Sequence, residues 1–183
     1  YNISNDSNKF YNSTIKELQY ISSHAENILF NIENLKEIAK ELCKSNSCFI
    51  LGKNIYESIS RECALKLKEI GYIHAEAFPG GSLKHGPFSL IEKNTPIILF
   101  IMDDNYKDFM LSTYEEVKTR GANIIVISDI NLKLPNLIQI PKLNTLGSIL
   151  SIIPLQVIAY EMAIIKGHNP DYPRNLAKVV TVD

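Results

Sequence analysis

The sequence has no excess of charge of either sign. Lys and Arg total 19 and Asp and Glu total 20, so the formal net charge is −1. This balance argues against a nucleic-acid-binding domain, which usually carries a basic excess. Hydrophobic residues make up 45% of the chain, too many for a disordered protein. A length of 183 residues therefore indicates one globular domain with a core of its own.

Cysteine is scarce: the chain has three, Cys43, Cys48 and Cys63. An odd number without a tight pairing motif does not indicate a disulfide framework, and their spacing is not that of a zinc site. We expect small buried thiols in a reducing compartment, which fits a cytoplasmic protein. No metal site is indicated, because His74 and His85 lie eleven residues apart with no third ligand evident.

Long apolar runs and a signal peptide are also missing from the sequence. No stretch approaches the ~18 apolar residues of a membrane span, so we expect none. Residues 1–9 are polar and rich in Asn and Ser, unlike a signal peptide, and we interpret residues 1–12 as a leader or linker. Because the chain begins with Tyr1 and not with Met, we expect it to be a piece of a longer protein.

Continuous apolar runs alternate with helical patterns along the rest of the chain. The periodicity predicts strands over residues 48–51, 72–78, 95–102, 123–129 and 137–140, and helices over residues 13–29, 32–43, 54–70, 105–120 and 146–166. Such alternation is typical of a parallel sheet covered on both faces. The predicted fold class is α/β: a three-layer α/β/α sandwich over residues 13–167 with a mostly parallel sheet of about five strands, followed by a tail over residues 168–183.

Gly-rich phosphate-binding loops are absent, since residues 51–54 match neither the Rossmann nor the Walker pattern. In this fold class, ligands bind beyond the carboxyl ends of the strands, which draws attention to residues 52–54, residues 62–87 and the tail. Thr145, Gly147 and Ser148 precede the last helix; they could bind an anion, although an ordinary helix start is favoured.

Three charged residues share one face of the predicted helix over residues 54–70. Glu62, Lys66 and Glu69 follow one another at spacings of four and three. The spacing alone allows an exposed salt-bridge ladder, worth a few tenths of a kcal/mol. It also allows a carboxylate base held beside an ammonium group, which can move a proton between adjacent carbons of a sugar.

His85 and the tail are the other candidates for chemistry. His85 follows the Pro79-Gly80-Gly81 loop; it could relay a proton at neutral pH or be a loop histidine bonded to backbone. Arg174 and Lys178 could meet phosphate or carboxylate, and Lys178 could form a Schiff base with a carbonyl. A solvated tail explains these residues equally well.

Three segments, taken together, resemble one family. They are residues 64–77 (ALKLKEIGYIHAEA), residues 83–87 (LKHGP) and residues 173–178 (PRNLAK), the last followed by Val-Thr-Val and an acid. With Pro154-Leu155-Gln156 in the long helix, they resemble the glutamine–fructose-6-phosphate aminotransferases (isomerizing), or glucosamine-6-phosphate synthases. The match is to the second sugar isomerase (SIS) domain and the C-terminal tail of that family, over about residues 13–183.

The resemblance implies a role for each residue that matches these motifs. Glu69 would move a proton between C1 and C2 of the sugar, and Lys66 would assist proton handling on the hydroxyls. His85 would open the sugar ring from across a dimer, and Lys178 would reach the open-chain carbonyl. Lesser or substrate-binding roles are implied for the remaining matches: Glu62, Arg174, Asn175 and Ala177.

The family converts fructose 6-phosphate and glutamine to glucosamine 6-phosphate and glutamate, and the resemblance implies no metal or organic cofactor. The expected partners are the sugar phosphate, a first SIS domain with the phosphate-binding serines and threonines, a glutaminase domain and a second copy in a homodimer, with no nucleic acid or membrane. Two alternatives stay open. Another SIS sugar-phosphate isomerase or deglycase need not keep residues 174–178, and a phosphosugar-binding regulator has no need of Glu69 or Lys178.

Overall fold

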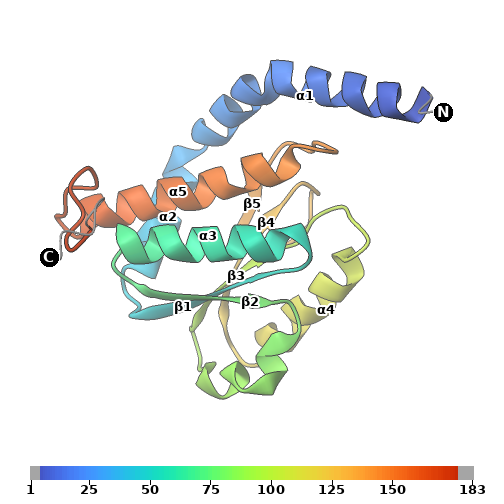
Figure 1. The fold of residues 1–183 in the computed structure, drawn as a ribbon. Helices are drawn as coiled ribbons and strands as arrows, with labels where there is room; N and C mark the ends of the chain where they lie inside the picture. The colour runs from blue at the N-terminus through green and yellow to red at the C-terminus, as the bar shows by residue number, and fades with distance from the viewer. Residues whose placement is uncertain (1–4, 177–183) are drawn as a thin grey trace, which may run out of the picture.

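The computed structural model describes residues 5–176 of the chain, whose elements form a five-stranded parallel sheet with helices on both faces (Figure 1). In chain order the elements are α1 (Asn5–Leu29), α2 (Ile32–Leu42), β1 (Ser47–Gly52), α3 (Ile55–Glu69), β2 (His74–Pro79), η1 (Ser82–His85), η2 (Pro87–Leu90), β3 (Pro96–Phe100), α4 (Lys107–Lys118), β4 (Asn123–Ser128), β5 (Leu137–Gln139) and α5 (Gly147–Ile165). The strand order is β2-β1-β3-β4-β5. The predicted fold class and the five-stranded sheet are confirmed.

Both faces of the sheet are buried, which explains the continuous apolar runs. In β1, Cys48 and Ile50 face the core formed with α2, α3 and α5, whereas Phe49 and Leu51 face the core formed with α4 and η1. Side chains alternate between the two sides of a strand, so a strand covered on both sides is apolar throughout. Figure 1 shows α3 and α5 on one side of the sheet and α4 on the other.

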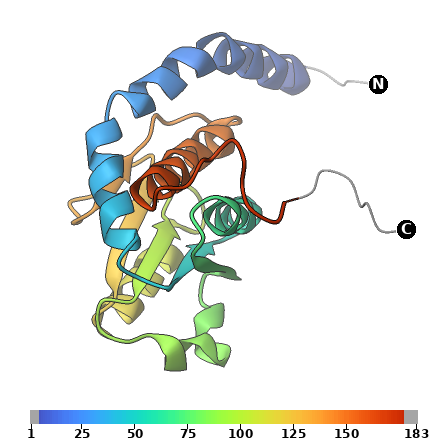
Figure 2. The same ribbon diagram turned by 90° about the vertical axis from the view of Figure 1, so that its left-hand side faces the viewer.

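Helix α1 begins earlier than the sequence pattern predicted. Its start is Asn5, whereas the apolar periodicity begins only near Ser13. The first turns are helical without an apolar stripe because they run past the body of the domain (Figure 2), with Phe10 and Tyr11 exposed. That residues 1–12 act as a leader or linker stays a prediction, and residues 1–4 lie outside the described part of the chain.

A buried carboxylate ties α1 to the start of α5. Glu17 accepts backbone N–H groups of Asn144, Thr145 and Leu146 at 2.7, 3.0 and 2.9 Å. Burial acts to raise the pKa of Glu17, but the three hydrogen bonds outweigh it and the pKa is lowered. Glu17 therefore holds residues 144–146 to α1, whereas α5 itself begins at Gly147 without a side-chain cap. That α5 has an ordinary helix start and not an anion site stays a prediction.

Helix α5 corrects the expectation that no stretch is apolar enough to span a membrane. By length and composition its 19 residues suffice. Isolated polar residues such as Gln156 and Glu161 interrupt the apolar run, yet the mean hydropathy of the helix stays high. Leu150, Leu155 and Ile158 are fully buried in the core of the domain. These contacts show α5 as a core helix of the α/β sandwich.

The cysteines behave as core residues where they are buried. Burial raises the pKa of the Cys48 and Cys63 thiols to about 12, with the nearby Glu62 adding to the effect at Cys63. Both thiols are therefore protonated at neutral pH and pack as small apolar groups. Cys43 is half-buried and free.

Candidate active site

The predicted charged cluster forms at the end of α3. Lys66 Nζ lies 2.7 Å from a carboxylate oxygen of Glu69 and 3.5 Å from one of Glu62. On the opposite side of the helix, Cys63 and Leu67 are buried in the core. The core-facing stripe thus fixes the rotation of α3, and the rotation directs the three charged side chains outward as a group.

Partial burial distinguishes this cluster from ordinary surface ion pairs of the same protein. The Glu69 and Lys66 side chains are 25% and 28% exposed, whereas in the Glu41–Lys44 pair at the end of α2 the two are 56% and 69% exposed. The hydrogen bond to Glu69 raises the pKa of Lys66; burial opposes this, and the charges of both carboxylates add to it. Lys66 is therefore an ammonium group at neutral pH, suited to donate to sugar oxygens but not to act as a neutral amine.

The cluster lies at the amino-terminal edge of the sheet. Helix α3 packs on β1 and β2 and returns from the carboxyl end of β1 to the amino end of β2, so Glu69 precedes the first residue of β2, His74. The general rule for α/β sheets pointed to the opposite edge, where residues 52–54 lie. It also drew attention to residues 62–87, which contain the cluster, but these side chains lie at the other edge because they belong to the crossover helix and not to a strand-end loop.

The tail returns to this same end of α3. The Arg174 backbone N–H donates to Tyr72 Oη at 2.9 Å, and the Arg174 guanidinium lies 4.3 Å from the centre of the Tyr72 ring. Asn175 follows with a φ of +59°. The structure thus brings Arg174 and Asn175 to the end of α3, whereas Ala177 and Lys178 lie outside the described residues, and their roles stay predictions.

Tyr72 is the site residue that sequence reasoning missed. The sequence pattern predicts a strand over residues 72–78, but β2 begins at His74 and Tyr72 has a φ of +47°, in the left-handed region. Its aromatic character favours a strand, and tertiary contacts override that preference. The preceding Gly71 was the only available sign of a turn at this point.

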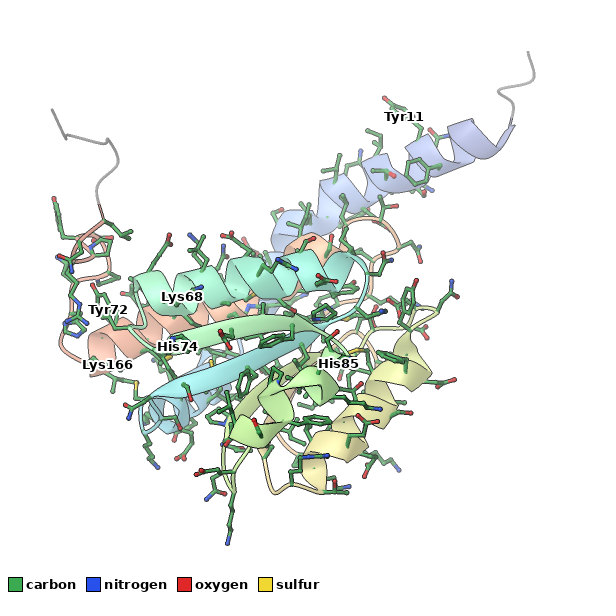
Figure 3. The ribbon with its side chains drawn as sticks, turned by 60° about the horizontal axis from the view of Figure 1, so that its bottom comes forward. Tyr11, Lys68, Tyr72, His74, His85 and Lys166 are labelled. Atoms are coloured by element: carbon green, nitrogen blue, oxygen red, sulfur yellow. The ribbon has the colours of Figure 1, made fainter. Side chains whose placement is uncertain are left out.

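His85 lies at the other end of β2, on η1, and is exposed. A six-residue strand is roughly 16 Å long, and Figure 3 shows Lys68, Tyr72 and His74 near one end of it and His85 near the other. Within a single chain, Glu62, Lys66 and Glu69 therefore lie together, whereas His85 lies apart from them.

The family model of the SIS domain matches residues 41–166, which includes the sheet, α3, η1 and α5. The chain belongs to the SIS domain family. The chain is 42% identical, over 84% of its length and 26% of the relative, to a probable glutamine–fructose-6-phosphate aminotransferase (isomerizing) from Acanthamoeba polyphaga mimivirus. It is 40% identical, over the whole chain and 30% of the relative, to the glutamine–fructose-6-phosphate aminotransferase (isomerizing) from Buchnera aphidicola subsp. Baizongia pistaciae. The chain thus spans under a third of these curated relatives.

Solved structures agree with this family. The C-terminal domain of glucosamine-fructose-6-phosphate aminotransferase from Francisella tularensis has a TM-score of 0.78 and 34% identity, over 84% of this chain and 45% of that one. A putative phosphosugar isomerase from Clostridium difficile has a TM-score of 0.76 over 94% of this chain and 49% of that one; at 20% identity it shows the fold alone. The resemblance stated from the three sequence motifs is confirmed.

Proposed function

We propose that this SIS domain and its tail form the C-terminal part of the isomerase module of a glutamine–fructose-6-phosphate aminotransferase. The observation that carries the proposal is the half-buried cluster in which Lys66 bridges Glu62 and Glu69, next to the docked tail. Curated relatives of that name match 84% and 100% of this chain. The parent enzyme would make glucosamine 6-phosphate and glutamate from fructose 6-phosphate and glutamine, in the cytoplasm.

The chemistry assigned to the cluster is a proton transfer between neighbouring carbons. Ammonia and the C2 carbonyl of open-chain fructose 6-phosphate form a protonated imine with loss of water. Glu69 takes a proton from C1 and returns it to C2, and the C1 hydroxyl loses its proton as the aldehyde forms. Lys66, held as an ammonium, donates to the sugar hydroxyls, and the step needs no metal or organic cofactor.

Two parts of this reaction need groups from elsewhere. Because His85 is separated from Glu69 by the length of β2, His85 can open the ring at this cluster only if it comes from a second copy of the chain. We also assign the phosphate-binding pocket to the first SIS domain of the parent. We therefore expect the isolated chain to have no sugar isomerase activity, and measurable interconversion of fructose 6-phosphate and glucose 6-phosphate by it would contradict this.

The test is Glu69→Gln in the full-length enzyme. We expect amino-sugar formation to fall about 10²- to 10⁴-fold, the usual contribution of a general base, while glutamine hydrolysis survives. The matched control is Glu41→Gln, which removes the same kind of Glu–Lys pair from α2 and should leave both activities unchanged. An unaffected amino-sugar rate would refute the role of Glu69, and joint loss of both activities with misfolding would indicate a structural role instead.

A further inference from the structure

Tyr72 stands in the turn that joins α3 to β2, three residues after Glu69. Its backbone is held in the left-handed region, at φ +47°, which non-glycine residues adopt only when their surroundings enforce it. The enforcing contact comes from the end of α5. Lys166 Nζ donates to the carbonyl oxygen of Gly71 at 2.6 Å and lies 3.4 Å from that of Tyr72. The direction of the Tyr72 side chain is thus set by a helix far away in the sequence.

The Tyr72 ring contacts the tail at two separate points. The His168 ring meets it edge-on, with the ring centres 4.7 Å apart. Six residues later, the Arg174 guanidinium lies 4.3 Å from the ring centre, and the Arg174 N–H donates to the hydroxyl at 2.9 Å. A half-buried tyrosine that binds both ends of residues 168–174 holds that segment as a loop against the domain.

We propose that Tyr72 is a positioning residue for the C-terminal tail. It holds residues 168–174 against the turn that follows α3 and Glu69. The position of Arg174, four residues before Lys178 in the sequence, is thereby fixed. Tyr72 itself touches no reacting atom and acts through the tail. The part of this inference that concerns catalysis rests on the proposed function, because only that function gives Lys178 a sugar carbonyl to reach.

Two variants distinguish the contribution of the Tyr72 ring from those of its hydroxyl and its backbone conformation. Tyr72→Asn removes the ring but suits the positive φ, since Asn tolerates the left-handed region. Tyr72→Phe keeps the ring and loses the hydroxyl that accepts the Arg174 N–H. The matched control is Tyr172→Asn, which removes a tyrosine of the tail that is 83% exposed.

The first measurement is the rate of tryptic cleavage after Arg174 in the full-length polypeptide, with cleavage after the exposed Lys133 as internal reference. Proteolysis in a native protein follows the population of the open form. Tyr72→Asn should raise the rate after Arg174 about tenfold, and Tyr72→Phe should raise it less. Tyr172→Asn should leave it unchanged. An unchanged rate in Tyr72→Asn overturns the proposal, whatever the enzyme does.

The second measurement is steady-state kinetics of the same full-length variants. Tyr72→Asn should lower kcat for amino-sugar formation about tenfold while glutamine hydrolysis and Tm stay close to those of the parent, and Tyr72→Phe should recover most of the loss. A freed tail with an unchanged kcat would overturn the positioning role. The proposed function fails independently if Glu69→Gln leaves amino-sugar formation intact, because the cleavage result does not depend on that activity.

Discussion

The two ends of β2 each carry a part of the candidate site, and they are built in different ways. At the amino end, Lys66 and Glu69 lie on one face of a helix and are joined by a 2.7 Å contact. At the carboxyl end, His85 lies on the short helix η1 and is exposed. The first arrangement needs only neighbouring residues of one helix, because Lys66 and Glu69 contact each other directly. The second depends on packing against distant residues and lies at the opposite end of β2 from the cluster.

Contacts with α4 hold the His85 end in place. Leu83 is fully buried, and Lys84 Nζ lies 2.7 Å from a carboxylate oxygen of Glu116. Gly81 has a φ of +83°, and a Cβ at this position would lie 2.7 Å from the Phe109 ring. Residues 81–84 are therefore held against α4, so the backbone at His85 is fixed although its side chain is exposed.

The largest expected effect tests whether the two ends meet between chains. In full-length enzyme, Glu69→Gln and His85→Asn should each lower amino-sugar formation at least about 100-fold. When the two variants are co-expressed, a mixed dimer has one site with both substitutions and one with neither. Random pairing should then restore about a quarter of the parent activity.

The control for this mixing is a chain that carries both substitutions, co-expressed with either single variant. It provides no intact pair in any dimer and should restore nothing. If the two single variants also restore nothing although mixed dimers are shown to form, Glu69 and His85 do not act across a two-chain site, and the contrast between the two ends of β2 loses its functional meaning.

The next effect tests how firmly the His85 end is held. Gly81→Ala places a Cβ against Phe109 in a backbone conformation that disfavours it, and should destabilise the chain by about 1–3 kcal/mol. Urea denaturation measures the change. Gly147→Ala is the matched control, because its Cβ would meet only ordinary contacts, no closer than 3.8 Å. Equal effects of the two substitutions would show that the loop is not constrained as described.

The smallest expected effect on stability concerns α5, which runs from the carboxyl edge of the sheet back to its amino edge. Glu17 binds the residues just before its start, and Lys166, just after its end, contacts the turn at Tyr72. Glu17→Gln should cost about 1–2 kcal/mol at pH 7. Because the pKa of Glu17 is lowered in the folded state, its stabilisation is present above the unfolded value of 4.5 and is lost as the pH falls through the folded pKa.

Urea midpoints measured at pH 7 and at progressively lower pH provide the check on Glu17. The difference between the parent and Glu17→Gln should shrink as the solution is made more acidic than pH 4.5. Glu26→Gln, on the exposed side of the same helix, should change the midpoint little at any pH. A Glu17 effect that is the same at all pH values would mean that its charge plays no part in holding α1 to α5.

Patterns of short range were sufficient for much of the fold. The run in β3 is apolar at every position because both faces of the sheet are covered, and its burial follows directly. Sequence patterns did less well where an element lies apart from the core. The sequence pattern predicts too late a start for α1, because residues 5–12 have no apolar stripe that indicates a helix. Composition also did not reveal α5 as an apolar stretch of membrane-span length.

The sequence by itself determined the charged cluster, because spacings of three and four on a helix place Glu62, Lys66 and Glu69 on one face whatever the rest of the chain does. Only the tertiary structure decided that Arg174 meets Tyr72, a contact between residues 102 positions apart. It also decided how α4 holds the loop that carries His85, through Glu116 and Phe109. Such placements depend on how α4 and α5 pack against the sheet, and no local period in the sequence encodes that packing.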